Sequence, residues 1–86
     1  MAQETRIGTV THYFGKVGVA AIELASGGLA LGDTIRVKGH TTDFTMTVDS
    51  MQIDRVEVPG ADRGQAVGIR VPEPARVGDE VYKVAG

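Results

Sequence analysis

Hydrophobic and polar residues alternate along this sequence in short runs that are separated by glycine. The clearest run spans residues 44–49, where Phe44, Met46 and Val48 fall on one face. Successive side chains of a β-strand point to opposite faces, so this period of two predicts a strand with one buried face. The hydrophobic parity reverses after Ser50, which predicts a bulge or bend there.

Similar runs recur along the chain and predict an all-β fold of six or seven short strands. The further runs are Ile7–Phe14, Val17–Leu24, Thr34–Lys38, Val56–Val58, Gln65–Val71 and Glu80–Val84. The one helix candidate, residues 22–31, contains two consecutive glycines that each cost about 1 kcal/mol relative to alanine. A small barrel is favoured, because closure removes exposed strand edges. We expect a flexible N-terminal tail at 1–5 and a single β-barrel domain at 6–84.

A hydrophobe-Gly-Asp pattern precedes two of the predicted strands, in residues 31–37 and again in residues 77–84. Glycine adopts a positive φ without steric cost, and an Asp side chain accepts a hydrogen bond from a nearby backbone N–H. We therefore expect each pattern to form a sharp turn that leads the chain into a strand.

The composition narrows the classes of protein. The 86 residues include 12 glycines and no cysteine, and the net charge is −2. The absence of cysteine excludes disulfides, thiolate catalysis and thiolate zinc sites, and is typical of a cytoplasmic protein. No apolar stretch is long enough to cross a bilayer, so we expect no membrane association. With this charge, any nucleic-acid contact would need a local basic patch.

No catalytic or cofactor motif is recognisable. Gly15 and Lys16 are followed by Val17 within a predicted hairpin, so there is no nucleotide triphosphate site. His12 and His40 are far apart and have no metal-type spacing, which predicts no metal site. The acidic residues lie mostly at predicted turns, where Asp caps backbone groups. We therefore expect no enzyme activity and no cofactor.

Five short motifs, in their order and spacing, resemble the second domain of the translational GTPases, such as elongation factor Tu. The motifs are Gly8-Thr9-Val10, Gly18-Val19-Ala20, Leu29-Ala30-Leu31-Gly32-Asp33, Ser50-Met51-Gln52 and Gly64-Gln65-Ala66-Val67-Gly68. The resemblance covers residues 6–84 and implies a Greek-key β-barrel. The chain looks like a small stand-alone elongation-factor-like protein.

The resemblance implies a tentative RNA-binding site after the central bend. Gln52 occupies the position of the family's acidic residue that meets the terminal ribose of tRNA, and Arg55 matches the family's arginine. A neutral amide makes a weaker contact than a carboxylate, and Ala66 stands where the tRNA carriers often have Asn. The alternative is that Gln52 and Arg55 are ordinary exposed residues at a strand end.

A second candidate RNA-binding surface lies at predicted turns. Tyr13 and Lys16 join an aromatic ring to a cation at a hairpin tip, where the ring could stack on a base and Lys could meet phosphate. Lys38 and His40 add donors at the following turn. The alternative is that the ring belongs to the core and that the turn is merely solvated.

The resemblance implies a non-enzymatic module that contacts tRNA, ribosomal RNA or the ribosome. The alternative is a protein-interaction adaptor that uses the barrel surface which packs on the G domain in the GTPases. Related barrels also occur as accessory domains of collagenase-like peptidases, which makes a protein partner of that kind an expectation as well.

Overall fold

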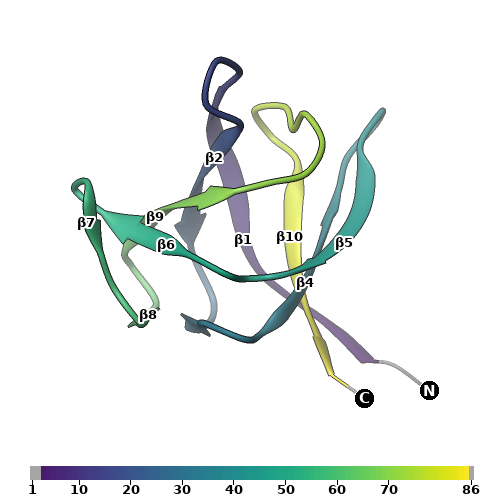
Figure 1. Cartoon of the computed structure of the whole chain (residues 1–86). Coiled ribbons are helices and arrows are strands. Elements are labelled where there is room, and N and C mark those ends of the chain that lie inside the picture. The colour runs from purple at the N-terminus through teal and green to yellow at the C-terminus, as the bar shows by residue number, and fades with distance from the viewer. Residues whose placement is uncertain (1–2, 86) are drawn as a thin grey trace.

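The computed structural model describes residues 3–85, which form strands and turns without a helix (Figure 1). The strands are β1 (Gln3–Phe14), β2 (Val19–Leu24), β3 (Leu29–Ala30), β4 (Thr34–Lys38), β5 (Asp43–Thr47), β6 (Met51–Ile53), β7 (Val56–Glu57), β8 (Gly60–Ala61), β9 (Ala66–Arg70) and β10 (Glu80–Ala85). The predicted all-β class is confirmed. The strands outnumber the six or seven predicted because β3, β6 and β8, with two or three residues each, are too short to show an alternating pattern.

Within residues 3–85, eight strands form one sheet in the order β5-β4-β10-β1-β2-β9-β6-β7, and β3 pairs with β8 separately. Every pairing is antiparallel. The long strand β1 is shared between β10 and β2, and its register shifts once against each neighbour. Such bulges bend a strand and increase its twist, which curves the sheet around a single interior.

The two ends of this sheet approach each other without pairing. β5 is one edge and β6 lies beside the other, yet only residues 48–50 separate them along the chain (Figure 1). At this bend the backbone of Val48 bonds to Asp33 and Gly32. β5 faces residues 70–72 across a hollow of about 310 Å³. No ladder closes the sheet among the described residues, so the predicted closed Greek-key barrel is not found.

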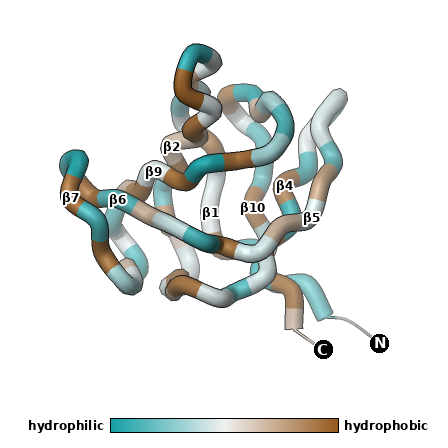
Figure 2. The backbone as a smooth tube through the Cα atoms, in the orientation of Figure 1, coloured by the Kyte–Doolittle hydropathy of each residue, from teal (hydrophilic) through white to brown (hydrophobic). Residues whose placement is uncertain are grey.

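The hydrophobic core lies on the concave face of the sheet, and Figure 2 shows hydrophobic segments recurring along its strands. Its largest fully buried side chains are Ile22, Leu24, Ile35, Met51, Ile69, Val10, Val37, Val48, Val67 and Val81. Burial of each such side chain contributes about 1.5–3 kcal/mol. Phe44, Val48 and Met51 are all buried, so the predicted reversal of parity at Ser50 is confirmed.

The two predicted hydrophobe-Gly-Asp turns are also confirmed. Gly32 and Gly78 have φ values of 89° and 95°. The carboxylate of Asp33 accepts a hydrogen bond of 2.9 Å from the Ala30 amide. The carboxylate of Asp79 accepts one of 2.8 Å from the Arg76 amide. Each turn therefore holds its own backbone while it aims the chain into β4 or β10.

The N-terminal end of the described chain is paired with its C-terminal end. Gln3 pairs with Ala85 and Thr5 with Lys83, so β1 includes three of the five residues that the sequence analysis placed in a tail. Met1 and Ala2 lie outside the described residues. Among residues 3–85 we find no helix with the length and apolar character that a membrane span requires.

Candidate functional site

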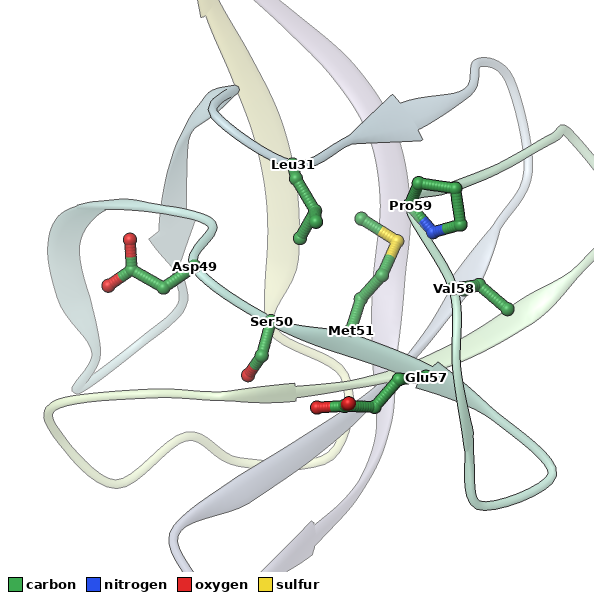
Figure 3. A pocket seen from close by; sticks show the side chains of 7 residues that line it. All are labelled: Leu31, Asp49, Ser50, Met51, Glu57, Val58 and Pro59. Carbon is green, nitrogen blue, oxygen red and sulfur yellow. The ribbon is translucent and has the colours of Figure 1, made fainter.

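A hollow of about 370 Å³ opens beside β6, between the end of β3 and the hairpin of β6 and β7. It is lined by Leu31, Asp49, Ser50, Met51, Glu57, Val58 and Pro59 (Figure 3). In Figure 3 the Met51 side chain points toward Leu31 and Pro59. These three side chains give the hollow an apolar floor, while Asp49 and Glu57 give it an acidic rim. We call it the apolar hollow.

A second hollow, of about 240 Å³, adjoins the first and is more polar in its lining. It is lined by Val19, Ser50, Gln52, Glu57, Gly68 and Arg70. We call it the polar hollow. Ser50 and Glu57 line both hollows, so the two adjoin each other at these residues, and together we call them the β6 groove.

Strand register explains why the polar hollow exists. Gln52 of β6 pairs with Glu57 of β7 on one side and with Gly68 of β9 on the other. Paired residues in an antiparallel sheet point to the same face, so the side chains of Gln52 and Glu57 lie together on the outer face. Gly68 carries no side chain, and the resulting gap between Gln52 and the Val19 side chain is the hollow.

The polar groups of the polar hollow are free to meet a ligand. None of the side-chain hydrogen bonds or ion pairs found among residues 3–85 uses Gln52, Glu57 or Arg70. All three residues are exposed. Arg70 supplies a cation with several donors, Glu57 supplies an anion, and the Gln52 amide both donates and accepts. The hollow can therefore bind a group that carries charge or a peptide unit.

The sequence-predicted site residues lie on three hairpins rather than at one place. Gln52 lines the polar hollow, and Arg55 occupies the turn between β6 and β7 with a φ of 66°. The remaining four lie on two other hairpins: Tyr13 and Lys16 between β1 and β2, and Lys38 and His40 between β4 and β5. Tyr13 is half-buried and packs against the core. The structure thus brings Gln52 together with Glu57 and Arg70, which the sequence analysis did not single out.

The two histidines remain separate from this groove. The His12 ring packs against the Phe14 ring at an interplanar angle of 57°, with ring centroids 4.3 Å apart. His40 lies in the exposed turn after β4. Within residues 3–85, no three or more His, Cys, Asp or Glu side chains gather in an arrangement that could hold a metal ion.

The relatives of this chain are proteases. A collagenase of Porphyromonas gingivalis is 35% identical over 82 residues, which are 94% of this chain and 23% of that protein. A protease of Methanocaldococcus jannaschii, itself uncharacterized, is 41% identical over 81 residues, which are 93% of this chain and 20% of that protein. The chain thus spans about a fifth of the length of these curated relatives. No family model matches it.

Solved structures of one protein domain share this fold. They are the C-terminal domain of a Geobacillus thermoleovorans protein described as a U32 peptidase. One superposes with a TM-score of 0.86 at 21% identity, covering 92% of this chain and 99% of that one. A second gives a TM-score of 0.83, covering 90% of this chain and 89% of that one. The chain therefore has the fold of a complete C-terminal domain from such a protein.

These findings correct the interpretation of the five glycine motifs. The resemblance to translational GTPases is wrong, because the matching proteins are collagenases and a protease and the matching structures come from a U32 peptidase. The prediction of a translation-factor module that contacts tRNA, ribosomal RNA or the ribosome is wrong for the same reason. In physical terms, glycine turns and short strands recur in any small β domain, so such motifs do not separate one family from another.

The expectation of no enzyme activity is also contradicted by these relatives, which are named as collagenases and a protease. It rested on the absence of a catalytic motif within 86 residues. The matched segment is only a fifth of each relative, so motifs elsewhere in those proteins are not visible in this sequence.

Proposed function

We propose that this chain is the polypeptide-recognition domain of a U32-type peptidase, working beside a catalytic domain. The observation that carries the proposal is the β6 groove, an apolar floor with a polar rim on a domain whose fold matches a peptidase C-terminal domain. The similarity to the relatives covers nearly all of this chain but a fifth of theirs, as a shared accessory domain requires.

The size and lining of the groove support an extended polypeptide as its occupant. One hollow, of about 370 Å³, is at the small end of the range of ligand sites, and the other, of about 240 Å³, is below it. Each can take one or two residues of an extended chain, whereas a folded protein would need a broad, flat surface. Two of the relatives are named collagenase, so we propose denatured collagen as the first substrate to test.

A binding measurement with the 86-residue chain on immobilised gelatin tests this function. We expect the natural chain to bind and the variant Gly68→Val to bind at least tenfold more weakly, because the new side chain fills the polar hollow. A Cβ at Gly68 meets the Val19 side chain at 3.3 Å, so that side chain must move by a few tenths of an ångström to accept it. The melting temperature of Gly68→Val shows whether this variant folds. Arg70→Gln provides a second variant at the same hollow.

The matched control is Gly15→Ala, which lies in the hairpin of β1 and β2, lines neither hollow and should bind gelatin like the natural chain. Absence of gelatin binding by the natural chain would overturn the proposed function. Equal binding by the natural chain and both groove variants would show that the groove is not the binding surface.

We also propose that the curved sheet is a small barrel closed by side-chain packing. Its support is the position of β5 opposite residues 70–72, with Met46 and Val71 lining the hollow between them. Proton NMR tests this: the side chains of Met46 and Val71 should lie close enough to give a nuclear Overhauser effect, and its absence would contradict closure by packing.

A further inference from the structure

We propose that the polar hollow binds the free carboxylate at the C-terminus of a polypeptide and that the apolar hollow takes the side chain of the last residue. This inference rests on the proposed function and names the part of the polypeptide that the groove recognises.

The donors that line the polar hollow fit a carboxylate. The Arg70 guanidinium, the Gln52 amide and the Ser50 hydroxyl all line it. A guanidinium binds a carboxylate through two parallel N–H···O bonds, and such charge-assisted bonds are roughly twice as strong as neutral ones. Arg70 is the one cationic side chain that lines either hollow of the groove among the described residues.

The strand register places these donors around one gap. Gln52 pairs directly with Gly68, and Arg70 lies two residues beyond Gly68 on the same face of β9. Diagonal neighbours of this kind in an antiparallel pair are about 7–8 Å apart, with the glycine leaving the space between them open. This separation is between backbone positions and is within reach of long side chains, so a carboxylate in the open space can accept hydrogen bonds from both Gln52 and Arg70.

The acidic residues of the groove select against other anions and orient the peptide. Glu57 lines both hollows, and Asp49 lines the apolar one. A multiply charged anion such as phosphate would be repelled by these carboxylates. A peptide C-terminus carries a single negative charge, and the backbone N–H of its last residue can donate a hydrogen bond to the Glu57 carboxylate. The ligand then runs from Arg70 past Glu57.

The adjoining apolar hollow determines which C-terminal residue fits. Because Ser50 and Glu57 line both hollows, a polypeptide whose terminal carboxylate lies at Arg70 can pass these two residues and direct its last side chain toward Met51, Leu31 and Pro59. These side chains favour an apolar residue such as leucine. A peptidase creates a new C-terminal carboxylate at every bond that it hydrolyses, so the groove is suited to hold the cleaved end of a polypeptide.

Fluorescence anisotropy with the 86-residue chain tests this inference. The probes are two labelled peptides of one sequence ending in leucine, one with a free C-terminal carboxylate and the other with a C-terminal amide. We expect the free acid to bind at least about tenfold more tightly than the amide. In Arg70→Gln this preference should disappear, and in the control Lys16→Gln, which removes a cation from the hairpin of β1 and β2, it should persist.

The outcomes separate this inference from the proposed function. Equal affinity of the acid and the amide, with gelatin still bound, overturns recognition of the C-terminus and leaves polypeptide binding in place. A preference for the acid that survives in Arg70→Gln also overturns the assignment. Failure to bind either peptide or gelatin overturns both proposals.

Discussion

The carboxylate of Asp79 lies directly against the α-carbon of Gly39. A side chain built at Gly39 would overlap Oδ1 of Asp79, and Asp79 is only 4% exposed. The other carboxylate oxygen accepts the hydrogen bond from the Arg76 amide, so the carboxylate cannot simply move away. This contact joins the turn between β4 and β5 to the turn that starts β10.

Replacement of Gly39 by alanine should therefore destabilise the fold. We expect Gly39→Ala to lower the free energy of unfolding by about 1–3 kcal/mol, because it forces a buried carboxylate from its position. For a domain of this size, that loss lowers the melting temperature by roughly 4–24 °C in a thermal unfolding measurement.

Gly15→Ala is the matched control for this prediction. A Cβ at Gly15 meets only the Tyr13 ring, at an ordinary contact distance of 3.6 Å, and its φ is not positive. Its melting temperature should stay within the small range of surface substitutions. Equal melting temperatures for both variants would contradict the role assigned to the Asp79 contact.

Acid should weaken the ion pair between Arg36 and Asp43. Two hydrogen bonds of 2.8 Å join their side chains across β4 and β5. The bonds from Arg36 hold the pKa of the Asp43 carboxyl below its ordinary value of 3.8. A carboxyl with a lowered folded-state pKa contributes stability above its unfolded pKa, and this contribution is lost as the pH falls through the folded value.

The measurement is the melting temperature of the natural chain and of Asp43→Asn between pH 7 and pH 2. The natural chain should melt higher at pH 7, and the difference should shrink below about pH 4. Asp49→Asn is the control, because none of the ion pairs among residues 3–85 includes Asp49. A difference for Asp43→Asn that is constant with pH would contradict the prediction.

The turn between β6 and β7 should be stabilised by glycine. Asp54 and Arg55 form a two-residue turn between paired residues Ile53 and Val56, with φ values of 51° and 66°. Hairpin turns of this kind favour Gly at the second position, because a residue with a side chain is strained at positive φ. We expect Arg55→Gly to raise the stability by about 0.5–1 kcal/mol in a denaturant titration.

Arg63→Gly supplies the comparison, since Arg63 is an exposed turn residue without a positive φ. It should be neutral or slightly destabilising. A loss of stability in Arg55→Gly as large as that in Arg63→Gly would show that the turn strain is not relieved.

Local patterns in the sequence predicted much of this fold. The alternation at Phe44, Met46 and Val48 identified a strand and its buried face, and Gly-Asp pairs identified the turns before β4 and β10. These features depend on neighbouring residues only. The pairing of β3 with β8 joins residues about 30 positions apart through two residues each, and no periodic pattern encodes it.

Less of the candidate site than of the fold could be predicted from the sequence. Gln52 was predicted through a family resemblance that the comparisons contradict. Its position in the groove is therefore not evidence for that resemblance. Arg70 and Glu57 are ordinary exposed strand residues in the sequence. They become neighbours of Gln52 only through the ladders of β6 with β7 and β9, and the space between them exists because Gly68 has no side chain.

Amide NMR of the 15N-labelled 86-residue chain, titrated with a gelatin-derived peptide, tests polypeptide recognition by the β6 groove most directly. We expect chemical-shift changes that saturate with added peptide and are concentrated at Ser50, Gln52, Glu57, Gly68 and Arg70. Changes confined to the hairpin of β1 and β2 or the turn after β4, or an unchanged spectrum, would contradict it.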